Sequence, residues 1–191
     1  LVGLDTGEKV TQFVIDNVKN DSFFESAGKA PETKFMTFLL ENNFLGNKTG
    51  KGFYHKTDQK DKKGKTIISA LDLKTLEYKP SISPKNPIIK EARAIEKMQK
   101  RMSFLICKEC KESLFLKEYF TAIFAYSVQR VPEISNQYYP VDDAMRAGYV
   151  WDFGPFEYWD LIGFQNGLDL IEAAGETVPE WIGQMKKAGA D

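Results

Sequence analysis

Glycine and lysine residues between positions 46 and 52 have the residue types of a phosphate-binding loop. Their spacing differs from that of a P-loop, and Gly52 stands where a Ser or Thr would hold magnesium. The cluster also follows a predicted helix, whereas a P-loop follows a strand. The pattern therefore favours a tight left-handed turn, in which Gly46 and Gly50 let the aromatic residues after them, including Tyr54, fold back on the core.

Two carboxylates, Glu157 and Asp160, lie three residues apart and could together perform acid–base chemistry. Gly154 and Pro155 come directly before them, and proline is favoured in the first turn of a helix. Glu157 would then lie in that first turn, where a carboxylate interacts favourably with the helix dipole. We therefore interpret Glu157 as a helix cap and not as a catalytic acid.

Histidine and cysteine offer few ligands or nucleophiles in this sequence. His55 is the single histidine and lies in a lysine-rich segment. Cys107 and Cys110 could both reach one metal ion from a helix, but a structural zinc site normally has four ligands. The sequence therefore predicts no metal site, and it assigns a catalytic role to no residue of this chain.

Most of the chain has the apolar periodicity of helices. A long helix is predicted over 87–111, and a second, over 114–129, is apolar enough to be a central core helix. Pro31 suits the first turn of a shorter helix, and Gly148 should end a helix over 141–147.

Two pairs of residues have the spacing of a capping box, which marks the start of a helix. Asp5 and Glu8 form the first pair, and Thr177 and Glu180 form the second. We therefore predict a helix after each pair.

The stretch from 52 to 80 departs from the helical pattern. Residues 66–70 alternate in the manner of a strand, and Gly64 lies in a turn cluster before them, so we predict a small β-hairpin. The prolines and serines of 80–87 predict an extended linker between two units.

Composition excludes several classes of protein. The 191 residues carry a net charge of −1, which gives no electrostatic reason to expect nucleic-acid binding. The aromatic cluster over 138–159 is interpreted as packing, because Arg130 and Arg146 are the only basic residues between 118 and 185. No apolar run approaches the roughly 20 residues that span a membrane. Two cysteines without a signal-peptide pattern predict a reducing, cytoplasmic location.

Two segments resemble each other at an offset of 160 residues. Gly3 and Gly7, with the apolar residues beside them, correspond to Gly163 and Gly167. We therefore expect an internal duplication in which 1–45 and 161–188 superpose. Both copies look incomplete, and the chain begins at Leu1, so we expect an excised part of a longer protein that either oligomerises or exposes an apolar patch.

Two phrases of the sequence carry a family resemblance. The first is Leu45-Gly46-Asn47-Lys48-Thr49-Gly50-Lys51-Gly52-Phe53-Tyr54. The second begins at Val141-Asp142-Asp143-Ala144-Met145-Arg146-Ala147-Gly148 and continues through Gly154-Pro155-Phe156-Glu157 and Trp159-Asp160-Leu161-Ile162-Gly163. Together they resemble the C-terminal helical domain of 3-hydroxyacyl-CoA dehydrogenases. The matching structural motif comprises Gly46, Gly50, Gly52, Tyr54, Gly154, Pro155, Glu157 and Asp160.

The resemblance implies a mainly α fold. It consists of two helical units, each like the C-terminal domain of 6-phosphogluconate dehydrogenase, with a small β-hairpin insertion between them. Residues 1–56 would be the rear part of the first helical domain, 57–86 the hairpin and proline-rich linker, and 87–191 the second helical domain. The helix around 101–112 lacks the Asn-Arg pair that the family pattern has, which implies that the second copy is structural.

The resemblance also implies NAD-dependent oxidation of 3-hydroxyacyl-CoA in fatty-acid β-oxidation. The family's Rossmann domain and its catalytic residues have no counterpart here, so NAD would belong to the full-length parent and the isolated piece would be inactive. Lys48 and Lys51 are the candidate contacts to the acyl-CoA phosphates. The implied partners are acyl-CoA, held through the missing Rossmann domain, a further copy of the chain, and an enoyl-CoA hydratase domain in the same polypeptide. The alternative is a non-catalytic helical interaction module.

Overall fold

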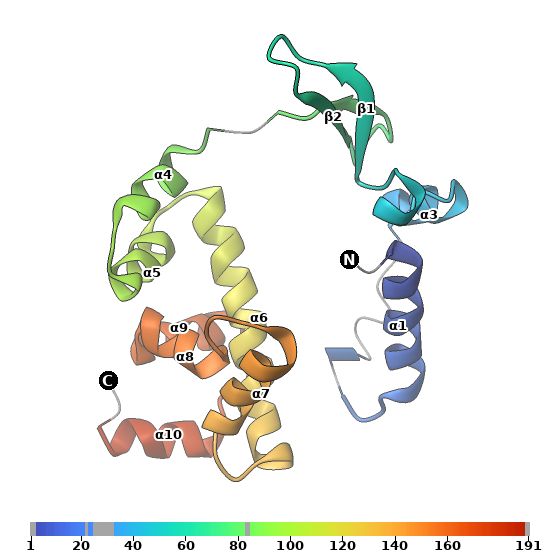
Figure 1. Ribbon diagram of the computed structural model, residues 1–191. Helices are drawn as coiled ribbons and strands as arrows, with labels where there is room; N and C mark the ends of the chain where they lie inside the picture. Colours follow the sequence, from blue (N-terminus) through green and yellow to red (C-terminus); the bar gives the residue numbers. More distant parts are fainter. Residues whose placement is uncertain (1–2, 22, 25–32, 83–84, 190–191) are drawn as a thin grey trace. The chain divides into compact units, whose positions relative to one another are not determined.

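The computed structural model describes residues 3–21, 23–24, 33–82 and 85–189, and it divides the chain into two compact units (Figure 1). Unit 1 is Leu1–Pro84 and unit 2 is Lys85–Asp191. The described residues are mainly helical, with one small antiparallel sheet in unit 1. This confirms the predicted mainly α fold with a small β-hairpin, whereas the likeness of the two units to the C-terminal domain of 6-phosphogluconate dehydrogenase stays a prediction.

The helices of unit 1 are α1 (Leu4–Asn17) and α3 (Lys34–Glu41), followed by the short 3₁₀ helix η1 (Asn47–Thr49). The predicted capping box of Asp5 and Glu8 is wrong: Gly3 is the N-cap residue, and Asp5 pairs with Lys48 instead. Helix α3 buries Leu39 completely and begins at Lys34, and Pro31 lies outside the described residues.

The sheet of unit 1 contains the predicted hairpin. Strands β1 (Tyr54–Lys60) and β2 (Thr66–Leu71) are antiparallel, and β3 (Tyr78–Pro80) adds to the other edge of β2. The Asp61 carboxylate accepts the N–H groups of Lys63 and Lys65 at 2.8 and 2.9 Å, which fixes the turn between β1 and β2. Three residues that end in proline give no alternating pattern, so sequence analysis did not predict β3.

Unit 2 is entirely helical in its described part. The long helix α6 (Lys111–Ile134) carries buried Phe120, Phe124 and Val128, which confirms the predicted central core helix. Helices α8 and α9 pack against it, and the core of the unit includes Trp159, Ile162, Leu168 and Ile171. The other helices are α4 (Pro87–Ala94), α5 (Met98–Cys107), α7 (Tyr139–Tyr149), α8 (Pro155–Ile162), α9 (Phe164–Ala173) and α10 (Glu180–Lys187).

Helix α6 continues past its predicted end and contains Pro132. Proline has no N–H to donate to the carbonyl of Val128, four residues earlier. The indole N–H of Trp181 donates to that carbonyl at 3.2 Å. The side chain from α10 thereby satisfies the acceptor that proline leaves open, and it ties the C-terminal helix to the core helix.

The boundaries of the other helices in unit 2 correct two predictions. The stretch 87–111 is not one helix: the chain breaks at Ile95, whose carbonyl accepts two hydrogen bonds from the Arg101 guanidinium at 2.7 and 2.9 Å. Helix α7 passes Gly148, and the left-handed residue that ends it is Val150, with φ of 56°.

The second predicted capping box is also wrong. Helix α10 has Pro179 as its N-cap residue, and its start shows no side-chain cap. The backbone carbonyl of Thr177 accepts a hydrogen bond from Gln129 on α6 at 2.7 Å. The segment before α10 is therefore held by the core helix and not by a local box.

Candidate functional site

The glycine-rich segment of unit 1 forms the predicted tight turn. Gly46 has φ of 104° and Gly50 is left-handed, with φ of 73°. A Cβ at Gly52 would lie 2.8 Å from the Gly46 Cα, so the two backbone segments approach too closely for any larger residue. The Gly46 N–H donates to the Lys51 carbonyl at 2.7 Å, and the Thr49 hydroxyl donates to the same carbonyl at 3.0 Å.

The aromatic residues after the turn separate in two directions. Phe53 packs against Phe35 of α3 at a ring distance of 6.0 Å, as expected for a chain that folds back on the core. The expectation for Tyr54 is wrong, because 66% of this side chain is exposed. Tyr54 is the first residue of β1 and Phe53 directly precedes it, and consecutive side chains of an extended chain point to opposite sides.

A cavity of about 870 Å³ lies beside this turn, within unit 1. The turn glycines line it together with Lys48, Lys56 and Gly3 at the start of α1. Its charged lining residues are both lysines, so the cavity favours an anionic ligand. This is the strongest candidate binding site in unit 1.

The two candidate lysines lie in different surroundings. Lys48 lines the cavity and forms an ion pair with Asp5, and its hydrogen bond holds the pKa of that carboxyl below its usual value. The Lys51 ammonium lies 3.9 Å from the centre of the Phe44 ring and 4.2 Å from that of Tyr78. Lys51 therefore packs on aromatic faces, and it is not among the residues that line the cavity.

His55 and the cysteines form no common site. His55 lies on β1 with its ring 6.1 Å from that of Tyr78. Cys107 is exposed at the end of α5, and the Cys110 sulfur lies 3.2 Å from the Ser113 hydroxyl. The part of the chain that the structure describes contains no group of three or more His, Cys, Asp or Glu residues that could hold a metal ion.

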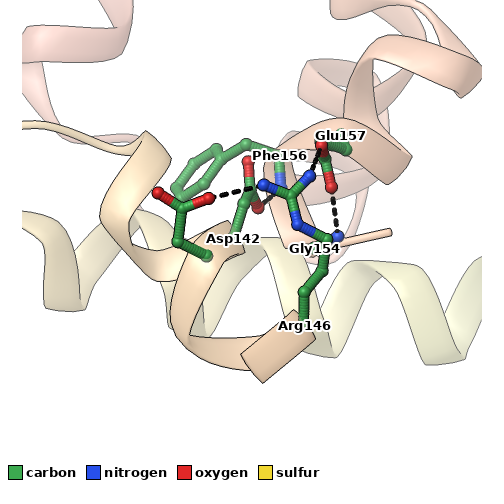
Figure 2. A network of polar contacts seen from close by, with 6 residues as sticks. Asp142, Arg146, Gly154, Phe156 and Glu157 are labelled. Carbon is green, nitrogen blue, oxygen red and sulfur yellow. Dashed lines mark hydrogen bonds and ion pairs between the residues drawn. The ribbon is translucent and has the colours of Figure 1, made fainter. Parts of the chain in front are cut away.

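In unit 2, the motif residues around Gly154 belong to a polar network that joins α7 to α8 (Figure 2). Glu157 accepts the backbone N–H of Gly154 at 2.7 Å, which confirms its predicted role as a helix cap. Arg146 of α7 forms ion pairs with Glu157 and with Asp143. Asp160 is exposed, whereas Glu157 is bonded within the network, which favours the cap over a carboxylate pair.

Asp142 is the buried centre of this network, with 4% of its surface exposed. Its carboxylate accepts the N–H of Phe156 at 2.8 Å, so a side chain of α7 caps the first turn of α8. Burial raises the pKa of Asp142 to about 6, although the hydrogen bond from Phe156 acts in the opposite direction. A Cβ at Gly154 would overlap Asp142, which explains why glycine precedes Pro155.

Sequence reasoning did not assign roles to Asp142 and Arg146. Their spacing of four residues places both on one face of α7, and that spacing was the available signal. Each charged group of the network has a partner within it: Asp142 and Glu157 accept backbone N–H groups at the start of α8, and Arg146 pairs with two carboxylates. We interpret it as the joint that fixes α7 against α8.

The amino-acid sequence of this chain is similar to parts of three longer curated proteins. The chain is 32% identical over 189 residues to a protein of Bacillus subtilis (strain 168) named as a 3-hydroxyacyl-CoA dehydrogenase; the match covers 99% of this chain and 23% of that protein. It is 27% identical over 172 residues to a protein of Rickettsia prowazekii (strain Madrid E) named as the trifunctional enzyme of a fatty acid oxidation complex, covering 90% of this chain and 21% of that protein.

A protein with the same trifunctional name from Rickettsia felis is 24% identical over 158 residues, covering 81% of this chain and 20% of that protein. No family model and no solved structure matches the chain. The comparisons confirm the resemblance: this chain is related to a part of 3-hydroxyacyl-CoA dehydrogenase and fatty-acid oxidation proteins. It spans about a fifth to a quarter of the length of these curated relatives.

Proposed function

We propose that this chain is the helical part of an NAD-dependent 3-hydroxyacyl-CoA dehydrogenase of fatty-acid β-oxidation. The main support is the 32% identity to the Bacillus subtilis relative, which extends along nearly the whole chain. In the proposed reaction, the C3 hydroxyl of (S)-3-hydroxyacyl-CoA is oxidised to a ketone, and the hydride is transferred to NAD. We further propose a cytoplasmic location, because the two cysteines suit a reducing compartment. As a separate finding, none of the helices that the structure describes is long and apolar enough to cross a membrane.

The described residues do not fit a dinucleotide site. NAD binding of the Rossmann type uses a glycine-rich turn between a parallel strand and a helix N-terminus. The sheet described here is antiparallel, and the glycine turn leads from α3 into β1. We therefore assign NAD to another part of the polypeptide, and we derive no step of hydride transfer from this chain.

The chain's own contribution, in this proposal, is binding and domain contact. The three phosphate groups of coenzyme A carry the charge that the basic cavity of unit 1 favours, and Lys48, which lines that cavity, is the proposed contact to them. Lys51 is the weaker of the two proposed contacts, since its ammonium packs on two rings. Gly154, Pro155 and Glu157 would hold the second helical unit in shape through the network described above, and Asp160 is proposed as a motif residue from the resemblance alone.

Helix α1 supplies a surface for contact with the rest of the enzyme. Val10 and Phe13 are 57% and 66% exposed, and none of the described residues of α1 is buried. Exposed apolar stripes of this kind mark interfaces. We propose that this stripe packs on another part of the dehydrogenase polypeptide or of a second subunit, and that an enoyl-CoA hydratase domain belongs to the same polypeptide, as the trifunctional names of two relatives suggest.

The test is a replacement of the matched segment. In the Bacillus subtilis relative, the matched segment is replaced by this chain, which gives a chimera. The rate of NADH oxidation with acetoacetyl-CoA is then measured for the chimera, for the unchanged Bacillus subtilis protein and for that protein with the segment deleted. We expect activity in the chimera and its loss on deletion, while the isolated chain gives no more turnover than its His55→Ala variant.

A chimera that is folded by circular dichroism and yet as inactive as the deletion would contradict the proposal. It would favour the alternative function, a non-catalytic helical interaction module, which the exposed stripe of α1 also supports. Turnover by the isolated chain above that of its His55→Ala variant would contradict the assignment of NAD and the catalytic residues to another part of the protein.

A further inference from the structure

One wall of the basic cavity in unit 1 is a face of the β-hairpin. Tyr54 and Lys56 lie two residues apart on β1, so their side chains share one face of the sheet. Ile68 of β2 is paired with Lys56 across the strands and belongs to the same face. All three residues line the cavity, whose volume of about 870 Å³ is within the range of small-molecule sites. The hairpin therefore gives the cavity an aromatic ring, a cation and an apolar side chain on one surface.

The side chains of this wall are open, whereas those of the opposite face of the sheet are covered. Tyr54 is 66% exposed and Ile68 is 39% exposed. On the opposite face, the ring of His55 lies 6.1 Å from that of Tyr78, and Ser69 is buried. The Tyr54 ring has no stacking partner among the residues that the structure describes. The face at the cavity therefore leaves a flat aromatic surface available to a ligand.

The two lysines that line the cavity differ in what they already bind. Lys48 forms an ion pair with Asp5. Lys56 is exposed, and within residues 3–21, 23–24, 33–82 and 85–189 its ammonium has no hydrogen-bond or ion-pair partner. Asp58 continues the same strand beyond Lys56, but it is not among the residues that line the cavity. Lys56 is therefore the lysine available to an anionic group in the cavity.

An open tyrosine ring on the same face as an unpaired ammonium suits a planar base that carries phosphate. Nucleic-acid bases stack on aromatic side chains, and a lysine ammonium binds phosphate as a point charge. Coenzyme A has an adenine base and phosphate groups together at the end opposite to its thioester. That end therefore matches the hairpin wall in both chemistry and charge.

We propose that the cavity of unit 1 holds the nucleotide end of acyl-CoA, with the adenine base on the Tyr54 ring beside Ile68 and a phosphate group at Lys56. The identity of the ligand rests on the proposed function, and the new element is the end of the ligand that this chain holds. The acyl thioester then lies outside the cavity, where it can reach the part of the polypeptide to which we assign NAD.

Isothermal titration calorimetry of the 191-residue chain tests which end of the ligand is bound. We expect CoA and adenosine 3′,5′-bisphosphate to bind one site with dissociation constants within about threefold of each other. Pantetheine, which lacks the nucleotide, should show no saturable binding, and pyrophosphate, which lacks the base, should bind about tenfold or more weakly than CoA. Absence of saturable CoA binding, or pantetheine or pyrophosphate that binds as tightly as CoA, would overturn the proposal.

Two pairs of variants test the contacts of the hairpin wall. Tyr54→Ser should weaken CoA binding about tenfold, and Tyr54→Phe, which keeps the ring, should recover most of that loss. Lys56→Met should weaken CoA binding about tenfold at low salt, whereas Lys62→Met removes the same charge from the turn, outside the lining, and should change it little. Thermal unfolding followed by circular dichroism shows whether each variant keeps its fold. Equal losses in the two lysine variants, or unchanged binding in Tyr54→Ser, would overturn the site.

The chimera with the Bacillus subtilis relative separates this proposal from the proposed function. In an active chimera, Tyr54→Ser should raise KM for acetoacetyl-CoA about tenfold with little change in kcat, because the adenine base takes no part in the reaction. An active chimera whose KM does not respond to Tyr54→Ser would overturn the nucleotide site while the dehydrogenase function stands. A folded but inactive chimera, with CoA still bound by the 191-residue chain through Tyr54 and Lys56, would contradict the dehydrogenase function and support the nucleotide site.

Discussion

Helices α1 and α9 begin alike and lie in different surroundings. Gly3 and Gly163 are their N-cap residues, and Gly7 and Gly167 occupy the same position in the first turn and a half of each helix. A Cβ at Gly167 would overlap the Trp159 indole, whereas a Cβ at Gly7 would meet nothing within 4 Å. The same residue type is therefore required by packing in one helix and not in the other.

The difference continues along the two helices. Helix α9 buries Leu168 and Ile171, and the residues 160 positions earlier in α1 are Glu8 and Thr11. The apolar residues of α1 follow another line, through Val10, Phe13 and Val14. The shared glycines are what the predicted duplication rests on, but the apolar residues lie at different positions of the two helices, buried in α9 and largely exposed in α1. Superposition of 1–45 on 161–188 stays a prediction.

The largest effect is expected from Gly167→Ala. The new methyl group cannot be accommodated beside Trp159, so we expect a loss of about 2–3 kcal/mol in the free energy of unfolding. All three tryptophans lie in unit 2, so tryptophan fluorescence during urea denaturation reports on this unit alone. In contrast, Gly7→Ala should leave that transition unchanged and add about 0.5–1 kcal/mol to helix stability. Equal effects of the two substitutions would break the comparison.

The next effect concerns the joint between α7 and α8. The pKa of Asp142 is about 6 in the folded chain, above its ordinary value near 4, so the folded state prefers the protonated carboxyl. Stability should therefore fall as the pH rises from 4 to 6 and level off above. Allowing for solvent screening, we expect about 1–2 kcal/mol.

Asp142→Asn isolates this contribution, because other titrating groups cancel between the two proteins. Urea midpoints measured from pH 4 to 7.5 should show the unchanged chain losing stability relative to the variant over that window. Parallel pH profiles would show that Asp142 does not titrate there.

A smaller effect is expected from Trp181→Phe. The substitution removes the indole N–H that satisfies the Val128 carbonyl, while most of the apolar contact stays. Leaving that acceptor open should cost about 1 kcal/mol. A double variant with Pro132→Ala restores a backbone donor, so the loss from Trp181→Phe should be smaller in that background. An unchanged loss would mean that the indole acts through packing alone.

Sequence analysis predicted the elements whose signals are local. The apolar periodicity of α6, the alternating β2 with its turn, and the cap at Glu157 all depend on residues close in the chain. The glycine turn was predictable for the same reason, because positive φ at Gly50 follows from residue type.

Contacts between distant residues explain the predictions that failed. Asp5 has the spacing of a capping box, yet it pairs with Lys48, and Arg101 supports the break at Ile95 that no local pattern marks. Asp142 was missed because its partner, Phe156, lies on the next helix. The roles of Lys48 and Lys51 in binding stay predictions.

The most direct test of the central claim uses Phe13→Ser in two settings. In the isolated chain, two thirds of this ring is exposed, so the free energy of unfolding should change by less than about 0.5 kcal/mol. In the chimera with the Bacillus subtilis relative, α1 would pack on the rest of the enzyme, and the rate of NADH oxidation with acetoacetyl-CoA should fall about tenfold, with a lower melting temperature. An active chimera that tolerates the substitution as well as the isolated chain does would contradict the proposed contact, and a folded but inactive chimera would contradict the dehydrogenase role itself.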